Sequence, residues 1–154
     1  MNIKNNIRHK ETMKNITSAL VSLLQNKSLK EISVTDICET EKINRSTFYE
    51  KFSDLHVLSK AFSEEVEKQA AEYPHNNEEF SWVFDYVKAN KDIFTAYFKV
   101  GISEIETDYK TIFFRNGVYS VIKLWFEEGC KESSEQMSEI VLREYRKCFK
   151  KSLL

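Results

Sequence analysis

Apolar positions recur every three or four residues along most of the chain, which is the spacing of one face of an α-helix. The first such stretch covers about residues 8–25. Two short helices are expected between Ser33 and Phe52, and a longer one over about residues 55–72. Residues 73–77, Tyr-Pro-His-Asn-Asn, form the strongest break in the pattern.

Beyond this break the same spacing predicts four more helices, over about residues 77–90, 91–100 and 104–128 and from Ser133 onward. Gly101 and Gly129 are expected to end the second and third of these. The chain has only three glycines and one proline in 154 residues, which favours long helices over sheets with regular turns.

The sequence therefore predicts an all-α fold of about eight helices. Residues 1–53 are expected to form one domain and residues 54–154 a second, with the helix of about residues 54–72 linking them.

The stretch from Ser33 to Phe52 has the pattern of two short helices joined by a tight turn. Ser33 and Asp36 have the spacing of a capping box, Lys42 and Ile43 make the connection, and Asn44 suits the start of the second helix. Phe48 and Phe52 are four residues apart and so share one apolar face. The polar residues left on the other faces are Arg45, Ser46, Thr47, Tyr49 and Lys51. A short helix with a polar first turn and an apolar back is what the DNA major groove accepts.

The run from Ile32 to Leu58 carries a denser signature, made of Val34-Thr35-Asp36-Ile37, Ile43-Asn44, Arg45-Ser46-Thr47-Phe48-Tyr49, Lys51-Phe52 and Leu58. In order and spacing it resembles the helix-turn-helix DNA-binding domain of the TetR/AcrR family of bacterial transcription regulators. Two positions depart from the family pattern. Lys42 stands where members usually have Gly, so the turn must accept a strained non-Gly residue. Leu55 stands where a Lys often follows the motif, which removes one phosphate contact.

The resemblance implies that six residues bind DNA: Thr35, Arg45, Ser46, Thr47, Tyr49 and Lys51. Arg45 would contact guanine through two hydrogen bonds, Ser46 and Thr47 would contact base edges or phosphates, and the other three would contact phosphates. Arg45 also has the simpler reading of a solvated charge, and Tyr49 that of a packing aromatic.

The last two helices carry more apolar residues than one face can bury, which predicts a homodimer interface. Its expected residues are Phe114, Val118, Val121, Ile122, Trp125, Met137, Ile140, Val141 and Tyr145. The alternative is a helix buried wholly in its own domain. The segments Phe114-Arg115-Asn116-Gly117, Trp125 and Gly129–Ser133 also resemble, more weakly, the body of short family members from Gram-positive bacteria, some of which act with protein partners.

Thirteen of the 20 aromatic residues lie between Phe80 and Phe126. Family members often enclose an effector in an apolar, aromatic pocket, and the residues expected to line one here are Phe84, Phe94, Tyr97, Phe98, Tyr109 and Phe113. The alternative is that these rings simply fill the core.

Charge is distributed unevenly along the chain, although the net charge is only −1. Residues 1–60 hold 10 Lys+Arg and 7 Asp+Glu, whereas residues 61–154 hold 13 and 17. A mildly basic N-terminal part suits a nucleic-acid partner. The basic residues near the start, Lys4, Arg8, His9, Lys10 and Lys14, form either a solvated tail or an arm that lies on phosphates.

The residues that would carry catalysis or bind a metal are scattered. The three histidines are isolated, and the chain has no Gly-rich phosphate loop and no nucleophile elbow, so no enzyme, metal site or cofactor is expected. The three cysteines are odd in number and far apart, which suits a reducing compartment. The first residues lack the apolar segment of a signal peptide, and no apolar run is long enough to cross a bilayer.

The expected protein is a cytoplasmic, homodimeric regulator of transcription. It would bind a palindromic site on double-stranded DNA, more often as a repressor than as an activator, and would be controlled by a small-molecule or protein effector at the C-terminal domain. The alternative is a helical adaptor that binds a partner protein and has weak or no affinity for an operator.

Overall fold

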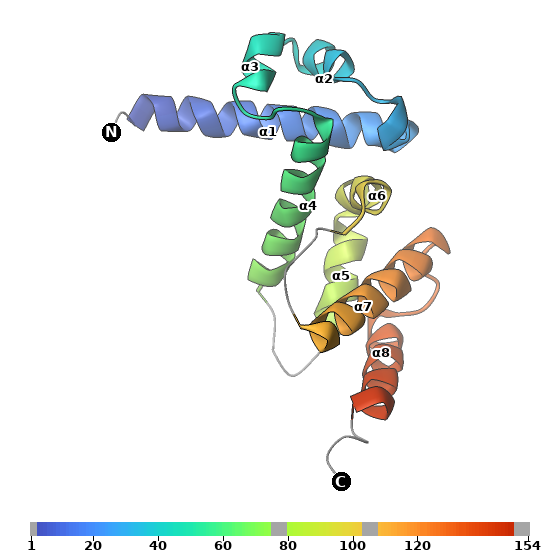
Figure 1. Cartoon of the computed structure of the whole chain (residues 1–154). Coiled ribbons are helices and arrows are strands. Elements are labelled where there is room, and N and C mark those ends of the chain that lie inside the picture. The colour runs from blue at the N-terminus through green and yellow to red at the C-terminus, as the bar shows by residue number, and fades with distance from the viewer. Residues whose placement is uncertain (1–2, 75–79, 103–107, 150–154) are drawn as a thin grey trace. The chain divides into compact units, whose positions relative to one another are not determined.

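The computed structural model describes residues 3–74, 80–102 and 108–149 (Figure 1). These residues form eight α-helices, one 3-10 helix and no strand, which confirms the predicted all-α fold. In chain order they are α1 (Ile3–Asn26), η1 (Leu29–Glu31), α2 (Val34–Glu41), α3 (Arg45–Tyr49), α4 (Leu55–Glu72), α5 (Ser81–Ala89), α6 (Lys91–Val100), α7 (Tyr109–Glu127) and α8 (Ser134–Phe149).

The chain divides into two compact units. Unit 1 comprises Met1–Glu67 and Asp92–Ser103, and unit 2 comprises Lys68–Lys91 and Glu104–Leu154. Unit 1 is therefore larger than the predicted domain of residues 1–53, because it also takes in most of α4 and the helix α6. The prediction that residues 1–53 form a helix-turn-helix DNA-binding domain stays a prediction.

Unit 1 is built on α1, along which α2 and α3 lie together (Figure 1). Its core contains Ile16, Leu20, Leu24, Ile37, Phe48, Phe52, Leu58 and Phe62, all buried. Helix α6 is fastened to α4 by two hydrogen bonds, from Ser63 Oγ to the Gly101 carbonyl at 2.8 Å and from the Tyr97 hydroxyl to Glu67 Oε1 at 2.9 Å.

Unit 2 packs α5 against both α7 and α8. The Phe84 and Trp125 rings meet edge to face with centroids 5.2 Å apart, and the Trp125 indole donates to the Glu132 carbonyl at 3.1 Å. Buried Ser134 donates to Asp85 Oδ1 at 2.5 Å. These contacts fix which side of α7 faces inward.

Most predicted helix ends are confirmed. Gly101 and Gly129 have φ of 102° and 87°, the left-handed conformation that glycine adopts without a steric penalty. The N–H of Ser133 donates to Gln136 Oε1 at 2.9 Å, and Ser133 Oγ accepts from Gln136 N at 3.3 Å, so a capping box opens α8 where the sequence predicts the last helix to begin. Helix α7 begins at Tyr109, where the Asp108 carboxylate caps it by accepting from the N–H groups of Lys110 and Thr111. The predicted starts at residues 77 and 104 lie outside the described residues.

Within the described ranges, no helix combines the length and the apolar character needed to span a membrane.

Candidate nucleic-acid interface

The interface predicted by the sequence begins at the first turn of α2. Ser33 N–H donates to Asp36 Oδ2 at 2.7 Å, and Ser33 Oγ accepts from Asp36 N at 3.2 Å, so the predicted capping box is formed. The hydrogen bonds from Ser33, side chain first, together with Lys27 at 3.1 Å, lower the pKa of Asp36 to about 2. Thr35 lies in this fixed turn and is exposed.

The turn between α2 and α3 depends on Lys42, which has φ 53° and ψ 40°. This is the left-handed region, where a side chain with a Cβ is strained. The conformation lets Ile43 N–H return to the Cys38 carbonyl at 3.0 Å and closes the end of α2. The expectation of a strained non-Gly residue in this turn is confirmed.

Helix α3 starts immediately after the turn and is short. The Asn44 carbonyl accepts from the N–H groups of Thr47 at 3.0 Å and Phe48 at 3.2 Å. Asn44 is thus the cap residue, as predicted, although its side chain makes no capping hydrogen bond. Phe48 is fully buried, and Phe52, which follows the end of the helix, is 4% exposed, so the apolar side of this segment packs into the core of unit 1.

The polar residues predicted to bind DNA lie outside this core. Arg45, Ser46 and Tyr49 are exposed, and Thr47 and Lys51 are half-buried. The Tyr49 ring packs edge-on against Phe48, with ring centroids 5.5 Å apart, and is 49% exposed. The packing interpretation of Tyr49 is therefore met in part, and its contact with DNA stays a prediction. The structure therefore presents all five on the surface of one short segment.

The segment that follows α3 leads into α4. Asp54 Oδ1 accepts from the Val57 N–H at 2.9 Å, and this hydrogen bond, ahead of those from Ser53 and His56, lowers the pKa of Asp54. Leu55, which departs from the family pattern, is half-buried. The first residue of α4 is thus a packing residue and offers no cation to a phosphate.

The residues predicted for a dimer interface separate into two groups. Ile122, Trp125, Met137 and Val141 are buried in the core of unit 2 and do not present a surface. Their physical role is to join α5, α7 and α8. The remaining five are half-buried or exposed: Phe114, Val118, Val121, Ile140 and Tyr145. The Phe114 and Tyr145 rings contact each other at 4.8 Å.

The residues predicted for an effector pocket are divided between the two units. Phe94, Tyr97 and Phe98 cluster on α6 with centroids 5.7–5.8 Å apart and belong to unit 1, whereas Phe84 packs in unit 2. Tyr109 is 92% exposed and Phe113 is 64% exposed, so these two rings do not line an enclosed pocket. The reason is that α7 turns its opposite side, with Trp125, into the core.

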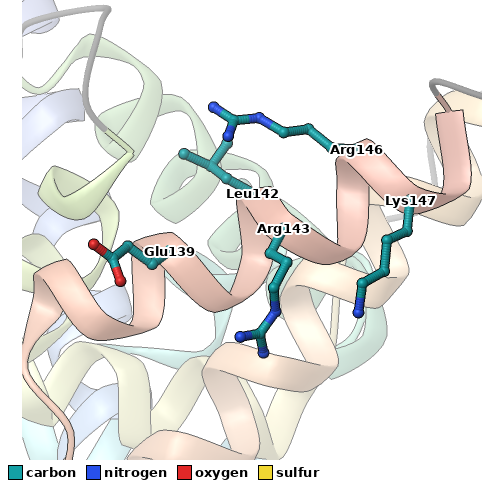
Figure 2. Close-up of a pocket in the computed structure, with 5 residues that line it drawn as sticks. All are labelled: Glu139, Leu142, Arg143, Arg146 and Lys147. Carbon is teal, nitrogen blue, oxygen red and sulfur yellow. The ribbon is translucent and has the colours of Figure 1, made fainter.

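A surface depression of about 600 Å³ lies along α8 and contains none of the predicted pocket residues (Figure 2). It is lined by Glu139, Leu142, Arg143, Arg146 and Lys147. The sequence signal that would have marked it is the recurrence of cations at three- and four-residue steps near the end of α8. Two of these cations form ion pairs with the Glu144 carboxylate, Lys147 at 2.9 Å and Arg143 at 3.1 Å. Both ion pairs lower the pKa of Glu144.

The part of the chain that the structure describes holds no group of three His, Cys, Asp or Glu side chains arranged to bind a metal ion. In comparisons with known proteins, no protein-family model and no curated protein matches this chain.

Proposed function

We propose that this protein is a sequence-specific DNA-binding regulator of transcription of the TetR/AcrR type. The observation that carries the proposal is the pairing of a left-handed Lys42 turn with a buried Phe48, which leaves Arg45, Ser46 and Tyr49 on the surface. A short helix whose apolar side packs into the core and whose polar side is exposed meets the requirement for entry into a DNA major groove.

In this proposal the exposed residues divide by chemistry. The Arg45 guanidinium presents paired donors to O6 and N7 of guanine, and Ser46 and Thr47 offer hydroxyls to base edges or phosphates. Thr35, Tyr49 and Lys51 position the helix on the backbone through phosphate oxygens. The charge-assisted cap at Asp36 supports this role, because it fixes the turn that carries Thr35.

The α2–α3 segment of one copy contacts too few bases to select a single site, so we propose that two copies bind a palindromic operator on one face of the duplex. An effector, either a small molecule or a protein, would bind outside the α2–α3 segment. It would favour a state in which the α2–α3 segments of the two copies no longer match the two half-sites of the operator. The family resemblance favours repression over activation and a cytoplasmic location.

The competing function is that of an adaptor that binds a partner protein. The observation that favours it is the exposure of large apolar residues on α7, led by Tyr109 at 92% and Phe113 at 64%. Under this alternative the α2–α3 segment would retain its fold and lack a selective DNA site.

Selection of bound DNA from a random duplex pool separates the two functions. The full chain is expected to enrich a palindrome, and the variant Arg45→Ala is expected to lose enrichment at one base of each half-site. Arg143→Ala, which removes an exposed Arg from α8, is the matched control and should enrich the wild-type palindrome. If the wild-type chain enriches no sequence above the starting pool, the regulator proposal is wrong.

A further inference from the structure

Lys42 occupies a backbone position that the fold alone would assign to glycine. It has φ 53° and ψ 40°, the left-handed region in which glycine has no steric penalty and lysine is strained. Asparagine and aspartate are the next most tolerant residues in this region, because their short side chains hydrogen-bond locally. A long basic side chain therefore destabilises the turn, and strained positions of this kind cluster at functional sites.

The side chain of Lys42 makes no contact that would compensate for this strain. It is exposed, and among the residues that the structure describes it forms no hydrogen bond and no ion pair. The turn is closed by the backbone instead, since Lys42 N–H donates to the Glu39 carbonyl at 3.4 Å and Ile43 N–H donates to the Cys38 carbonyl at 3.0 Å. A glycine would form the same backbone hydrogen bonds, so the positive charge of Lys42 has no role in the fold.

The α2–α3 segment is poor in cations for a surface that would lie on DNA. Residues 33–52 hold three basic and four acidic residues, a net charge of −1: Lys42, Arg45, Lys51, Asp36, Glu39, Glu41 and Glu50. Leu55, the first residue of α4, adds no charge. If Arg45 contacts a base, Lys42 and Lys51 are the two cations left for phosphates. Because phosphate contacts supply the sequence-independent affinity for DNA, each of these two cations should have a large effect on binding.

Lys42 lies close enough to Arg45 to contact the DNA backbone while Arg45 contacts a base. Arg45 follows Lys42 by three residues, so their Cα atoms are at most about 11 Å apart. The DNA major groove is about 12 Å wide, and phosphates line both of its edges. The lysine ammonium group is carried on a flexible four-carbon chain, which extends its reach beyond the backbone of the turn. A phosphate at the edge of the groove is therefore within reach of Lys42.

We propose that Lys42 is a phosphate-contacting residue of the DNA surface and supplies the cation that Leu55 does not. The strained lysine is retained because glycine, although better suited to the turn, has no charge to offer the DNA backbone. Since a phosphate contact carries no sequence information, Lys42 adds affinity for every duplex and no base preference. The inference rests on the proposed function and deepens it, because it adds a residue to the six that the family resemblance implies.

Fluorescence anisotropy titrations of the full chain test this role, with the selected palindrome and a scrambled duplex at several salt concentrations. Lys42→Ala keeps the Cβ and removes the ammonium group. It should weaken binding to both duplexes by the same factor, about threefold to tenfold for each bound copy near 0.1 M salt. It should also lower the slope of log affinity against log salt concentration by about 1 for each copy.

Three further variants separate the charge of Lys42 from other effects. Lys42→Arg keeps the charge and should keep the wild-type salt slope. Lys42→Gly removes both the charge and the strain, so it should bind DNA as weakly as Lys42→Ala although its fold is more stable. Lys131→Ala removes an exposed lysine from unit 2 and is the matched control, with affinity and salt slope unchanged. Circular dichroism and the melting temperature show that each variant is folded.

Three results would overturn the proposal: an unchanged affinity and salt slope in Lys42→Ala, a base preference altered at one position, or a Lys42→Gly variant that binds as tightly as the wild type. Failure of the proposed function looks different. A wild-type chain that binds duplexes and enriches no palindrome contradicts the regulator, and the comparison of Lys42 variants on the scrambled duplex then still decides the role of Lys42. A wild-type chain that binds no duplex would overturn both.

Discussion

The ammonium group of Lys99, on α6, donates a hydrogen bond to the carbonyl of Leu24, in the last turn of α1. It also reaches the carbonyls of Gln25 and Lys27, each at 3.3 Å. The last carbonyls of a helix have no partners within the helix, and the negative end of its dipole attracts a cation. One lysine from 75 residues further along the chain therefore closes the end of α1, the helix along which α2 and α3 lie.

The first prediction concerns this contact. Lys99→Met keeps most of the side-chain length and removes the cation, so it should lower the free energy of unfolding by about 0.5–1 kcal/mol. Urea denaturation followed by circular dichroism measures the change. Lys60→Met removes an exposed lysine from α4 and should have no measurable effect. Equal stability of the two variants would show that the Lys99 contacts are weak in solution.

Local signals in the sequence were sufficient for the fold class and for most helix ends. The caps at Ser33, Gly101 and Ser133 each depend on residues within four positions, which a reader of the sequence can recognise. The exposed positions of Arg45 and Tyr49 followed from the spacing of Phe48 and Phe52 in the same way.

Features that depend on distant residues were not predictable. Helix α7 has apolar residues on opposite sides, and its packing against α5 and α8, including the contact of Phe84 with Trp125, decides which side is buried. For that reason Trp125 was expected at an interface and lies in the core, and Tyr109 was expected in a pocket and lies on the surface. The Lys99 contact spans too many residues to leave a pattern in the sequence.

The second prediction concerns the strained turn. Lys42 holds a left-handed conformation, φ 53°, that costs a residue with a Cβ about 1 kcal/mol relative to glycine. Lys42→Gly should therefore raise the free energy of unfolding by up to about 1 kcal/mol. Lys42→Ala is the matched control, because it removes the charge and keeps the Cβ, and it should give no such gain. Thermal denaturation of both variants measures the difference, and a gain in Lys42→Ala equal to that of Lys42→Gly would assign the effect to charge.

The third prediction concerns pH. The hydrogen bonds from Ser33, with Lys27, lower the pKa of Asp36 to about 2 in the folded protein, against about 3.9 for an unperturbed Asp. The folded state thus binds this proton less readily than the unfolded chain, so the stabilisation is complete above pH of about 4 and is lost as the pH falls toward 2.

Asp36→Asn should therefore melt at a lower temperature than the wild type at pH 7, and the difference should shrink between pH of about 4 and about 2. Comparing the two chains cancels the titration of other capping carboxylates such as Asp54 and Asp108. A difference in melting temperature that stays constant down to pH 2 would mean that the Asp36 charge does not stabilise α2.

The last prediction separates reading from positioning at the proposed DNA surface. Arg45 is exposed at the first residue of α3, and Lys51 is half-buried just beyond its end. A contact to a base edge costs discrimination at one position when it is removed, whereas a contact to phosphate costs affinity for every sequence. Arg45→Ala should thus lose about 1–3 kcal/mol on the selected palindrome and little on a scrambled duplex.

Lys51→Ala should weaken binding to both duplexes by the same factor. It should also reduce the slope of log affinity against log salt concentration by about 1 for each bound copy, because each copy then releases one fewer counterion. Fluorescence anisotropy titrations at several salt concentrations measure both quantities. The two roles would be exchanged if Arg45→Ala weakened binding to both duplexes alike while Lys51→Ala changed the base preference. The exposed first turn of α3 would then contact the DNA backbone, and the residues just beyond its end would contact the bases.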